Sequence, residues 1–412
     1  MKIGLFGLGT VGQGLLKMIR EGGHNIEVVG VVDRSYQKKK DILGNIPASD
    51  DVNFLLERDD LDAIVELIGG LDLPLFIVRE AIDKKIPVVT ANKALIAEHG
   101  YTLLNKAQLL DVKVSFEAAV TGAIPIIHNL LAVFKHDNIT RLEGILNGTS
   151  NYILTEMRRK KVEYGPTLKK AQELGYAEAD PTLDVGGLDA THKLAILASL
   201  ISNTWVEYNH VNTRGITEVS LADIHWAEKM NYRLRLIGRY QRQNDKNFLS
   251  VEPTLITSDH FLWDIELENN AILIEAENSK SHLMVGKGAG ALPTAFSVLN
   301  DLLAINEPKK FAPDFRWEYA RLAPLSEMRS PFYLRLRVGD EPGVLAQIAS
   351  ILGENKISIA SVQQDIQYKT DDEVDLVIVT HSCERAAMTA ALQNIESQQA
   401  VKNRAVYLPI DE

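Results

Sequence analysis

Short apolar runs alternate with helical patterns through the first 130 residues of the chain. Apolar runs of this length, rich in valine and isoleucine, are typical of parallel strands that are buried on both faces of a sheet. The runs are Ile3–Phe6, Val28–Val32, Ala63–Ile68, Pro87–Thr90 and Val112–Phe116. The pattern therefore predicts an α/β fold whose residues 1–130 form a Rossmann-type, doubly wound domain.

The pattern changes twice after this domain. Residues 131–305 mix strands and helices without regular alternation, which predicts an α+β domain with an antiparallel sheet. Residues 306–330 carry prolines and mixed charge, and we expect them to be a connector. In residues 331–412 the predicted order is β-α-β-β-α-β, the order of a small ferredoxin-like sandwich.

Composition supports a multidomain protein and excludes several classes of function. At about 150 residues per domain, the 412 residues correspond to two or three domains. The formal net charge of −11 counts against nucleic acid and anionic membranes as partners. The single cysteine, Cys383, excludes an intramolecular disulfide and fits a reducing compartment. With no signal peptide and no spanning apolar stretch recognised, we expect a cytoplasmic enzyme.

A glycine-rich turn directly follows the first predicted strand and opens an amphipathic helix. Its residues Gly7, Leu8, Gly9, Thr10, Val11 and Gly12 fit the pattern G-x-G-x-x-G. In this context the glycines permit a tight turn, let a pyrophosphate approach the backbone and let helix and strand pack closely. The turn predicts a dinucleotide site, and the alternative is a βα turn that binds no ligand.

The residues after the second strand bear on the choice of dinucleotide. Asp33 ends this strand, where a carboxylate accepts hydrogen bonds from the adenosine ribose and repels a 2′-phosphate. Arg34 follows immediately and suits such a phosphate. Asp33 therefore favours NAD and Arg34 favours NADP, so the pattern does not decide between the two cofactors.

Two further segments carry candidate polar chemistry. Lys93 follows the strand that ends near Thr90, and the carboxyl ends of such strands are where ligands bind. A lysine there can stabilise a phosphate, a carboxylate or an oxyanion, whereas the alternative is a solvated loop residue. From Glu117 to Pro125 a small-residue turn offers carbonyl groups that suit a hard cation, with a purely structural turn as the alternative.

The densest group of charged residues lies between Gly175 and Lys193. Asp189 and Lys193 are four residues apart on a predicted helix, so they share one helix face. A lysine among carboxylates can donate a proton to a carbonyl oxygen that is being reduced, and carboxylates can bind a substrate ammonium group. The alternative is a capped helix with solvated charges. Ahead of the helix stand the other carboxylates of the group, Glu178, Asp180 and Asp184.

Five segments of the chain resemble segments that occur in the same order in homoserine dehydrogenases. The segment from Ala171 to Lys193 matches the family signature at every fixed position. The other four are Val88–Lys93, Glu117–Pro125, Gly144–Leu154 and Gly286–Ala295. The resemblance implies the reversible conversion of L-homoserine and NAD(P)⁺ into L-aspartate 4-semialdehyde and NAD(P)H, in threonine, methionine and isoleucine biosynthesis.

The resemblance also implies roles for individual residues. Lys193 is the acid/base on the substrate oxygen, Lys93 assists at the nicotinamide and substrate, and Asp189 supports both catalysis and substrate binding. The remaining substrate residues are Gly175, Glu178 and Asp184. Gly288 and Gly290 belong to a segment that returns to the cofactor. A sodium ion is implied at Glu117, Val120, Gly122 and Ile124. Residues 131–305 become the catalytic and dimerisation domain, with a homodimer or higher homo-oligomer expected.

The segment from Pro331 to Leu345 resembles the opening of an ACT domain. Asp340 and Gly343 lie between its first strand and first helix, followed by Val344 and Leu345. The helix N-terminus there can bind the carboxylate of an amino acid. The resemblance implies an amino-acid effector, with threonine favoured, and the alternative is a domain that only dimerises.

Two other functions compete with a homoserine dehydrogenase. One is an NAD(P)-binding amino-acid sensor without catalysis, and the other is a related dehydrogenase or reductase of an amino-acid aldehyde. The complete set of Lys193, Asp189, Glu178 and Lys93 argues against a pure sensor, which has no need of these residues.

Overall fold

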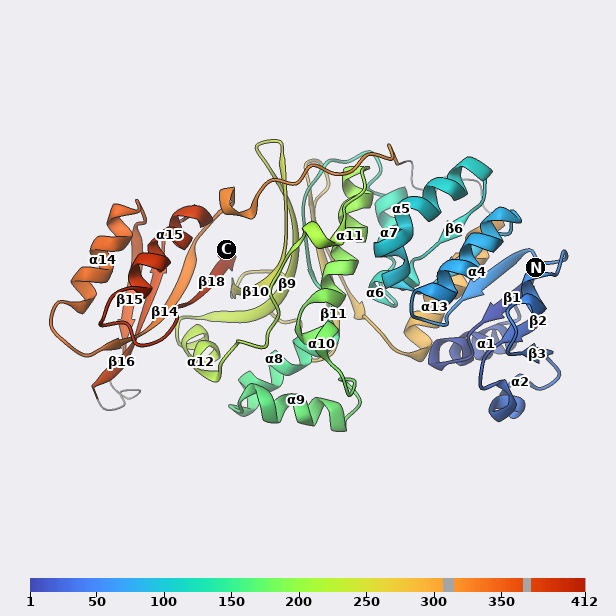
Figure 1. The fold of residues 1–412 in the computed structure, drawn as a ribbon, viewed down its shortest axis with the longest axis horizontal. Helices are drawn as coiled ribbons and strands as arrows, with labels where there is room; N and C mark the ends of the chain where they lie inside the picture. The colour runs from blue at the N-terminus through green and yellow to red at the C-terminus, as the bar shows by residue number, and fades with distance from the viewer. Residues whose placement is uncertain (307–314, 366–371, 412) are drawn as a thin grey trace. The chain divides into compact units, whose positions relative to one another are not determined.

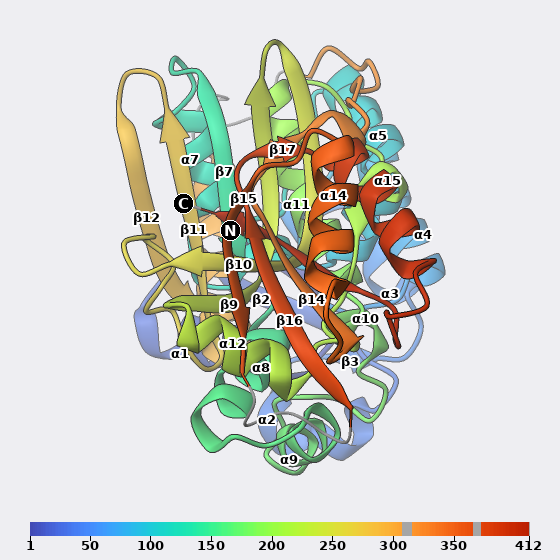
Figure 2. The same ribbon diagram turned by 90° about the vertical axis from the view of Figure 1, so that its left-hand side faces the viewer.

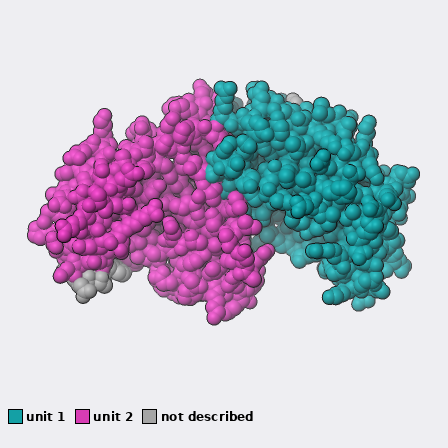
Figure 3. All heavy atoms as spheres, viewed as in Figure 1, with its two compact units in different colours: residues 1–148, 189–211, 268–321 teal, residues 149–188, 212–267, 322–412 magenta. Residues whose placement is uncertain are grey.

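The computed structural model describes residues 1–306, 315–365 and 372–411. The predicted connector and the C-terminal domain therefore each lie partly outside the described residues. The chain forms two compact units, coloured in Figure 3, which are described here one by one. The first unit comprises residues 1–148, 189–211 and 268–321, and the second comprises residues 149–188, 212–267 and 322–412.

A parallel sheet of six strands forms the N-terminal part of the first unit. Its strand order is β3-β2-β1-β4-β5-β6, the order of a dinucleotide-binding fold. The strands are β1 Lys2–Phe6, β2 Glu27–Val32, β3 Ala48–Ser49, β4 Ala63–Glu66, β5 Val88–Thr90 and β6 Val114–Ser115. The helices around it are α1 Thr10–Gly22, α2 Lys40–Leu43, α3 Asn53–Leu56, α4 Asp72–Asp83 and α5 Lys93–Leu110 (Figure 1). The predicted doubly wound domain is confirmed.

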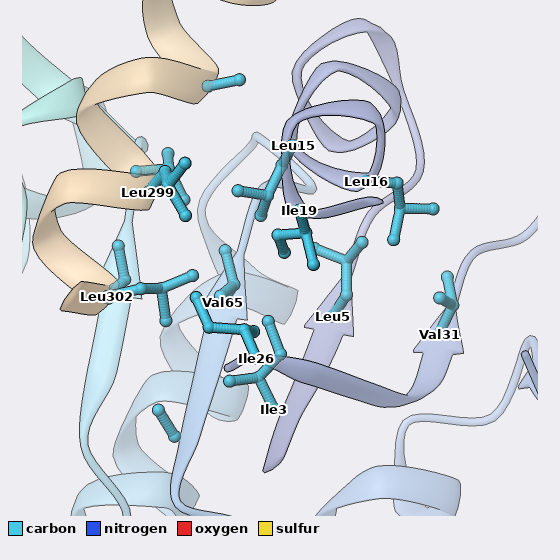
Figure 4. Close-up of a cluster of buried hydrophobic side chains, with 14 of the residues drawn as sticks. Ile3, Leu5, Leu15, Leu16, Ile19, Ile26, Val31, Val65, Leu299 and Leu302 are labelled. Atoms are coloured by element: carbon cyan, nitrogen blue, oxygen red, sulfur yellow. The ribbon is translucent and has the colours of Figure 1, made fainter. Parts of the chain in front are cut away.

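A helix from much later in the chain covers one face of this sheet. Helix α13, Ala291–Leu303, packs beside α1, and Val298 and Leu302 join Leu15 and Leu16 in one buried apolar cluster (Figure 4). A second cluster, formed with α4 and α5, covers the opposite face. Because burying apolar surface stabilises by about 25 cal/mol per Å², the contact between α1 and α13 attaches the later segment firmly to the cofactor-binding fold.

The rest of the first unit supplies an antiparallel sheet and one buried helix. Strand β11, Asn269–Ala276, pairs with β7, Ile139–Ile145, and with β12, Lys280–Lys287. Helix α11, Leu188–Ser202, is buried over most of its length. The remaining elements are the short helices α6 Ala118–Thr121 and α7 Ile126–Ala132, and the 3₁₀ turns Tyr36–Lys39, Tyr208–His210 and Ala304–Asn306.

The second unit is built on strands in the order β9-β10-β18-β14-β16-β15. These are β9 Tyr232–Gln243, β10 Lys246–Thr257, β14 Phe332–Gly339, β15 Ile359–Gln364, β16 Glu373–Thr380 and β18 Val406–Asp411. Its helices are α8 Gly148–Lys160, α9 Tyr164–Glu173, α10 Thr182–Val185, α12 Leu221–Lys229, α14 Val344–Glu354 and α15 Arg385–Glu396. Short elements are β8 Asn212–Thr213 on β10, the pair β13 Arg329–Ser330 and β17 Cys383–Glu384, and the turn Leu325–Glu327.

The C-terminal part has the predicted ferredoxin-like order. Helices α14 and α15 cover one face of strands β14, β15 and β16, and their apolar side chains share one core (Figure 2). Cys383 lies in this core, where burial raises the pKa of its thiol. The last strand, β18, also pairs with β10, so the C-terminal sheet continues into the strands before it.

Buried ion pairs reinforce this continuity. Arg385 binds both carboxylate oxygens of Glu252 on β10, at 2.9 and 2.6 Å. Arg239 on β9 lies 2.5 Å from Asp411 on β18. Since each carboxylate and its guanidinium are almost fully buried, removal of α15 and β18 would take away hydrogen-bonded partners of Glu252 and Arg239 in the second unit.

Among the described residues, none of the helices combines the length and the apolar character that crossing a membrane requires.

Candidate active site

The carboxylate of Asp189 holds two lysine side chains. Lys193 Nζ donates a hydrogen bond to Asp189 Oδ2 at 2.8 Å, one turn farther along α11. Lys93 Nζ, at the start of α5, lies 2.5 Å from Asp189 Oδ1. The Asp189 side chain is 3% exposed, Lys193 is 9% exposed and Lys93 is 39% exposed. The structure thus brings together the three residues that the sequence analysis proposed for catalysis.

Two buried asparagines complete the cluster, and the sequence analysis did not identify them. Asn147 Nδ2 donates to Asp189 Oδ2 at 2.8 Å, directly after strand β7. Lys193 Nζ also donates to the carbonyl oxygen of Leu146 at 2.7 Å, and Asn270 Nδ2 donates to the same oxygen at 2.9 Å. The polar groups of α11, β7 and β11 therefore fix the ammonium group of Lys193 from several directions.

The charges of the cluster determine the ionisation of Asp189. Burial alone would raise the pKa of this carboxyl, but the charges of Lys193 and Lys93 outweigh it and hold the pKa well below its ordinary value. Asp189 is therefore an anion at neutral pH. A permanent anion between two lysines orients both ammonium groups, which is the arrangement that proton transfer to a substrate oxygen requires.

Gly288 lies against this cluster, and its small size is required there. A Cβ atom at Gly288 would lie 2.2 Å from the amide carbon of Asn270, so any side chain would displace that amide. Gly122 is also close to the backbone of Gly288, because its Cβ would lie 2.7 Å from the Gly288 carbonyl carbon. Gly290 has a φ angle of 125°, a conformation that favours glycine, and it caps α13.

The glycine-rich turn has the geometry of a dinucleotide cradle. Gly7 has a φ angle of 98°, and a Cβ there would lie 2.7 Å from the backbone of Leu67. A Cβ at Gly12 would lie 2.3 Å from the carbonyl oxygen of Gly7, so helix and strand approach each other too closely for a side chain. At Gly9 a Cβ would meet no atom within 4 Å, which leaves open space beside the N-terminus of α1. The residues present fit a bound pyrophosphate.

The carboxylate at the end of β2 already has a cationic partner. Lys39 Nζ lies 2.9 Å from both oxygens of Asp33, and the backbone amide of Leu8 donates to Oδ2 at 2.8 Å. Burial raises the pKa of Asp33, but Lys39, Ser35 and the Leu8 amide outweigh it and lower the pKa to about 2. Arg34 is exposed. The sequence analysis did not identify Lys39, although a run of three lysines shortly after the strand was a signal.

The turn after Glu117 is a compact structure held by its own hydrogen bonds. The carboxylate of Glu117 accepts bonds from the backbone amides of Ile127 and His128 at 2.8 Å, and it lies 2.6 Å from His128 Nδ1. The Glu117 amide donates to Asp301, whose pKa is raised to about 7 by burial and by the charge of Glu117. The Glu117 carboxylate is thus engaged by three donors, and the carbonyl oxygens of Gly122 and Ile124 accept hydrogen bonds from Ser297 Oγ and the Ile126 amide. Each carbonyl oxygen has a second lone pair that suits a cation.

The remaining substrate candidates belong to the second unit. Gly175 has a φ angle of 78° and ends α9, and Glu178 is exposed in the loop that follows. Asp184 lies in α10, where its carbonyl oxygen accepts a bond from Ser150 Oγ at 2.9 Å. These three residues lie on one continuous segment that leads into α11.

The effector candidates lie at the start of α14. Gly343 has a φ angle of 94° and is the N-cap of this helix, and Val344 is its first residue. The Asp340 amide donates to the carbonyl of Asp372 at 2.8 Å. Val344 is buried and Leu345 is 42% exposed, so one side chain anchors the helix while the next lies at the surface.

Comparisons with known proteins agree with this geometry. The family profile for the homoserine dehydrogenase NAD binding domain matches residues 7–117, and that for homoserine dehydrogenase matches residues 125–303. An ACT domain profile matches residues 332–397. The homoserine dehydrogenase of Pseudomonas aeruginosa is 37% identical over 100% of this chain and 99% of its own length. This chain belongs to the homoserine dehydrogenase family. It is an NAD(P)-dependent oxidoreductase with an ACT domain.

Two further homoserine dehydrogenases are similar along nearly the whole chain, and a third is similar over 74% of it. The Bacillus subtilis enzyme is 35% identical over 98% of this chain and 96% of its own length. The crystal structure of a homoserine dehydrogenase from Thiobacillus denitrificans has a TM-score of 0.93 at 36% identity and covers 100% of this chain and 98% of that one. A hyperthermophilic archaeal homoserine dehydrogenase in complex with NADPH has a TM-score of 0.62 at 26% identity, covering 74% of this chain and 97% of that one.

Proposed function

We propose that this chain catalyses the reversible conversion of L-homoserine and NAD(P)⁺ into L-aspartate 4-semialdehyde and NAD(P)H. The observation that carries the proposal is the cluster in which buried Asp189 holds buried Lys193 and partly exposed Lys93. The chain that carries it matches a homoserine dehydrogenase over its whole length. The turn from Gly7 to Gly12 would hold the dinucleotide, which as NAD(P)H would supply a hydride to the aldehyde carbon and as NAD(P)⁺ would accept one from the alcohol carbon.

Each residue of the cluster has a distinct task in this proposal. In the direction of reduction, the Lys193 ammonium donates its proton to the aldehyde oxygen, and in oxidation the neutral amine accepts the hydroxyl proton. Asp189 keeps the amine in place through both steps, because its own proton affinity is low. Lys93, with 39% of its side chain exposed, can reach substrate and nicotinamide while it remains paired with Asp189.

The acidic segment of the second unit supplies the residues that we propose bind the amino-acid part of the substrate. Glu178 and Asp184 carry negative charge to match the substrate ammonium group, and Gly175 exposes backbone at the turn between them and α9. Chemical complementarity and the family resemblance support these three assignments.

A direct assay tests the proposed reaction. Purified full-length protein should reduce NAD⁺ or NADP⁺ when L-homoserine is added, and Lys193→Ala should lower kcat by about 10²-fold or more. Lys17→Ala, an exposed lysine on α1, is the control and should keep full activity. Cofactor binding without turnover would favour a sensor, and turnover only with another amino-acid alcohol would favour a related dehydrogenase.

The proposed sodium site rests on the turn between Glu117 and Ile124. Because the Glu117 carboxylate is occupied, the ion would be bound by the carbonyl groups of Glu117, Val120, Gly122 and Ile124. We expect NaCl to raise thermal stability more than choline chloride does at equal ionic strength. Equal effects of the two salts would contradict the site.

Regulation and assembly complete the proposal. The ACT domain is expected to bind an amino acid at Asp340, Gly343, Val344 and Leu345, and threonine is the first candidate. Initial rates with and without threonine test this, since an effector must lower turnover or substrate affinity.

We also propose a cytoplasmic homodimer or higher homo-oligomer, with domain boundaries at residues 130, 305 and 330. Light scattering tests the assembly, and a monomeric mass would contradict it.

A further inference from the structure

A buried carboxylate, Glu66, lies at the carboxyl end of the parallel sheet, and the proposed reaction does not use it. Glu66 is the last residue of β4, and Thr90 is the last residue of the neighbouring strand β5. Both side chains are fully buried. Thr90 Oγ1 donates a hydrogen bond to Glu66 Oε2 at 2.6 Å. Both residues thus stand at the carboxyl ends of strands, where dinucleotide-binding folds place their ligands.

One chain of hydrogen bonds leads from Glu66 to the start of α5. Thr90 Oγ1 accepts a bond from the backbone amide of Asn92 at 3.0 Å. The side chain of Asn92 then accepts from the Leu95 amide at 3.0 Å, which caps α5 at its N-terminus. Lys93 is the next residue, so the Cα position of Lys93 depends directly on these bonds.

A second chain of hydrogen bonds leads from Glu66 toward the dinucleotide turn. The backbone amide of Ile68 donates to Glu66 Oε1 at 2.8 Å, and the amide of Gly69 also binds this carboxylate. Gly70 accepts a bond from Asn92 Nδ2 at 2.7 Å, which joins the two chains. The backbone of Leu67 in the same segment lies directly against Gly7.

A buried carboxylate is a costly way to hold two loops. Burial raises the pKa of Glu66 and is opposed by its bonds to Thr90, Ile68 and Gly69. A packed apolar side chain would stabilise the core at no such cost. The two carboxylate oxygens, however, accept from two loops at once, Oε1 from the Ile68 amide and Oε2 from the Thr90 hydroxyl.

We propose that Glu66 is a positioning residue of this enzyme, which acts through Thr90 and Asn92 to place Lys93 beside the reacting groups. The inference rests on the proposed role of Lys93. It differs from that role because the Glu66 side chain is fully buried and has no surface that a substrate or cofactor could contact. Its effect on turnover passes through the geometry of the loop between β5 and α5.

Two substitutions break the chain of hydrogen bonds at different points. Glu66→Gln puts an N–H donor where Thr90 now finds its acceptor, so the hydroxyl proton of Thr90 loses its acceptor. Thr90→Val removes the hydroxyl and leaves the Asn92 amide unpaired, whereas Thr90→Ser retains it. Since a misplacement of about 1 Å can cost about 10²-fold in rate, we expect Glu66→Gln and Thr90→Val to lower kcat about 10- to 100-fold. Thr90→Ser should stay within about twofold of the wild type, because its hydroxyl preserves both hydrogen bonds.

A double-mutant cycle with Lys93→Met separates positioning from a general loss of structure. If Glu66 acts through Lys93, Glu66→Gln should lower kcat in the wild type and have no further effect in the Lys93→Met background. Glu143→Gln is the control, because Glu143 is also fully buried in the first unit and pairs with Arg141 at 2.8 Å. It should not change kcat, and thermal unfolding of every full-length variant measures any loss of fold.

The outcomes are distinguishable. Multiplicative losses in the double variant, or an unchanged kcat in Glu66→Gln, would overturn the inference while the proposed function stands. Failure of Thr90→Ser to retain activity would also overturn it. An unchanged kcat in Lys93→Met would overturn both the role of Lys93 and the inference that depends on it.

Discussion

The substitution Asp189→Asn tests whether a buried charge holds the two lysines together. Asparagine keeps the shape of the side chain but removes the charge, so Lys193 and Lys93 would face each other without a counterion. Removing one partner of a buried ion pair costs about 3–5 kcal/mol. We expect a value near the lower end, since 39% of the Lys93 side chain is exposed and water can solvate its charge. Urea unfolding of the full-length protein at pH 7 measures this cost.

Asp60 offers a matched control for this substitution. Its carboxylate is also bound by two basic residues, Lys2 at 3.1 Å and Arg58 at 2.8 Å, but 36% of its side chain is exposed. Exposed ion pairs contribute little to stability because water and salt screen them. Asp60→Asn should therefore change the free energy of unfolding much less than Asp189→Asn does.

The pH dependence gives an independent measurement. The pKa of Asp189 is depressed in the folded state, so its stabilising contribution is complete above its ordinary value of 3.8 and declines as the pH falls toward the folded value. The stability difference between wild type and Asp189→Asn should be equal at pH 7 and pH 5 and smaller at pH 3. A cost no larger than that of Asp60→Asn, or a difference that grows in acid, would refute the buried ion-pair cluster.

Three further predictions test other parts of the structure. Lys39→Met removes the cation that neutralises the carboxylate at the end of β2, so kcat/KM with NAD⁺ should rise relative to NADP⁺, and an unchanged ratio in initial-rate kinetics would contradict this role. Arg385→Met removes two hydrogen bonds from the buried carboxylate of Glu252 but leaves Arg214 beside it at 3.6 Å, so it should cost about 3 kcal/mol in urea unfolding, whereas Arg329→Met, in an exposed pair, should cost little. Gly288→Ala places a Cβ 2.2 Å from a buried amide beside the lysine cluster and should lower kcat more than it raises KM for the cofactor; the reverse pattern would contradict this contact.

Regular hydrophobic patterns allowed much of the fold to be predicted. The order β-α-β-β-α-β predicted for residues 331–412 occurs in the structure, and the parallel strands of the first domain occur within a few residues of their predicted bounds. Strand Tyr232–Gln243 was not predicted, because arginines interrupt its apolar pattern. The structure shows why it is nevertheless a strand: Arg239 is buried with an acidic partner, and Arg235 is buried against a backbone carbonyl at 2.9 Å.

Some contacts of the candidate site could be predicted from local spacing in the sequence, whereas others join residues that are far apart along the chain. The contact between Asp189 and Lys193 follows from their spacing on one helix, and spacing is visible in a sequence. Asn147 binds Asp189 from 42 positions away along the chain, and Asn270 binds the Leu146 carbonyl oxygen that accepts from Lys193. No local sequence pattern predicts these contacts.

A glycine can mark a close contact with a residue far away along the chain, but that residue is identified only by the structure. Gly288 belongs to a segment that resembles a cofactor-binding glycine motif, and the structure shows a second constraint on it, because the space for its side chain is filled by Asn270. That amide binds the Leu146 carbonyl, which in turn accepts from Lys193. A glycine assigned to the cofactor is therefore also part of the support of the proposed acid/base. Close packing leaves no space for relaxation at such a contact. We therefore expect a methyl group added at Gly288 to displace the Lys193 ammonium group rather than the backbone of Gly288.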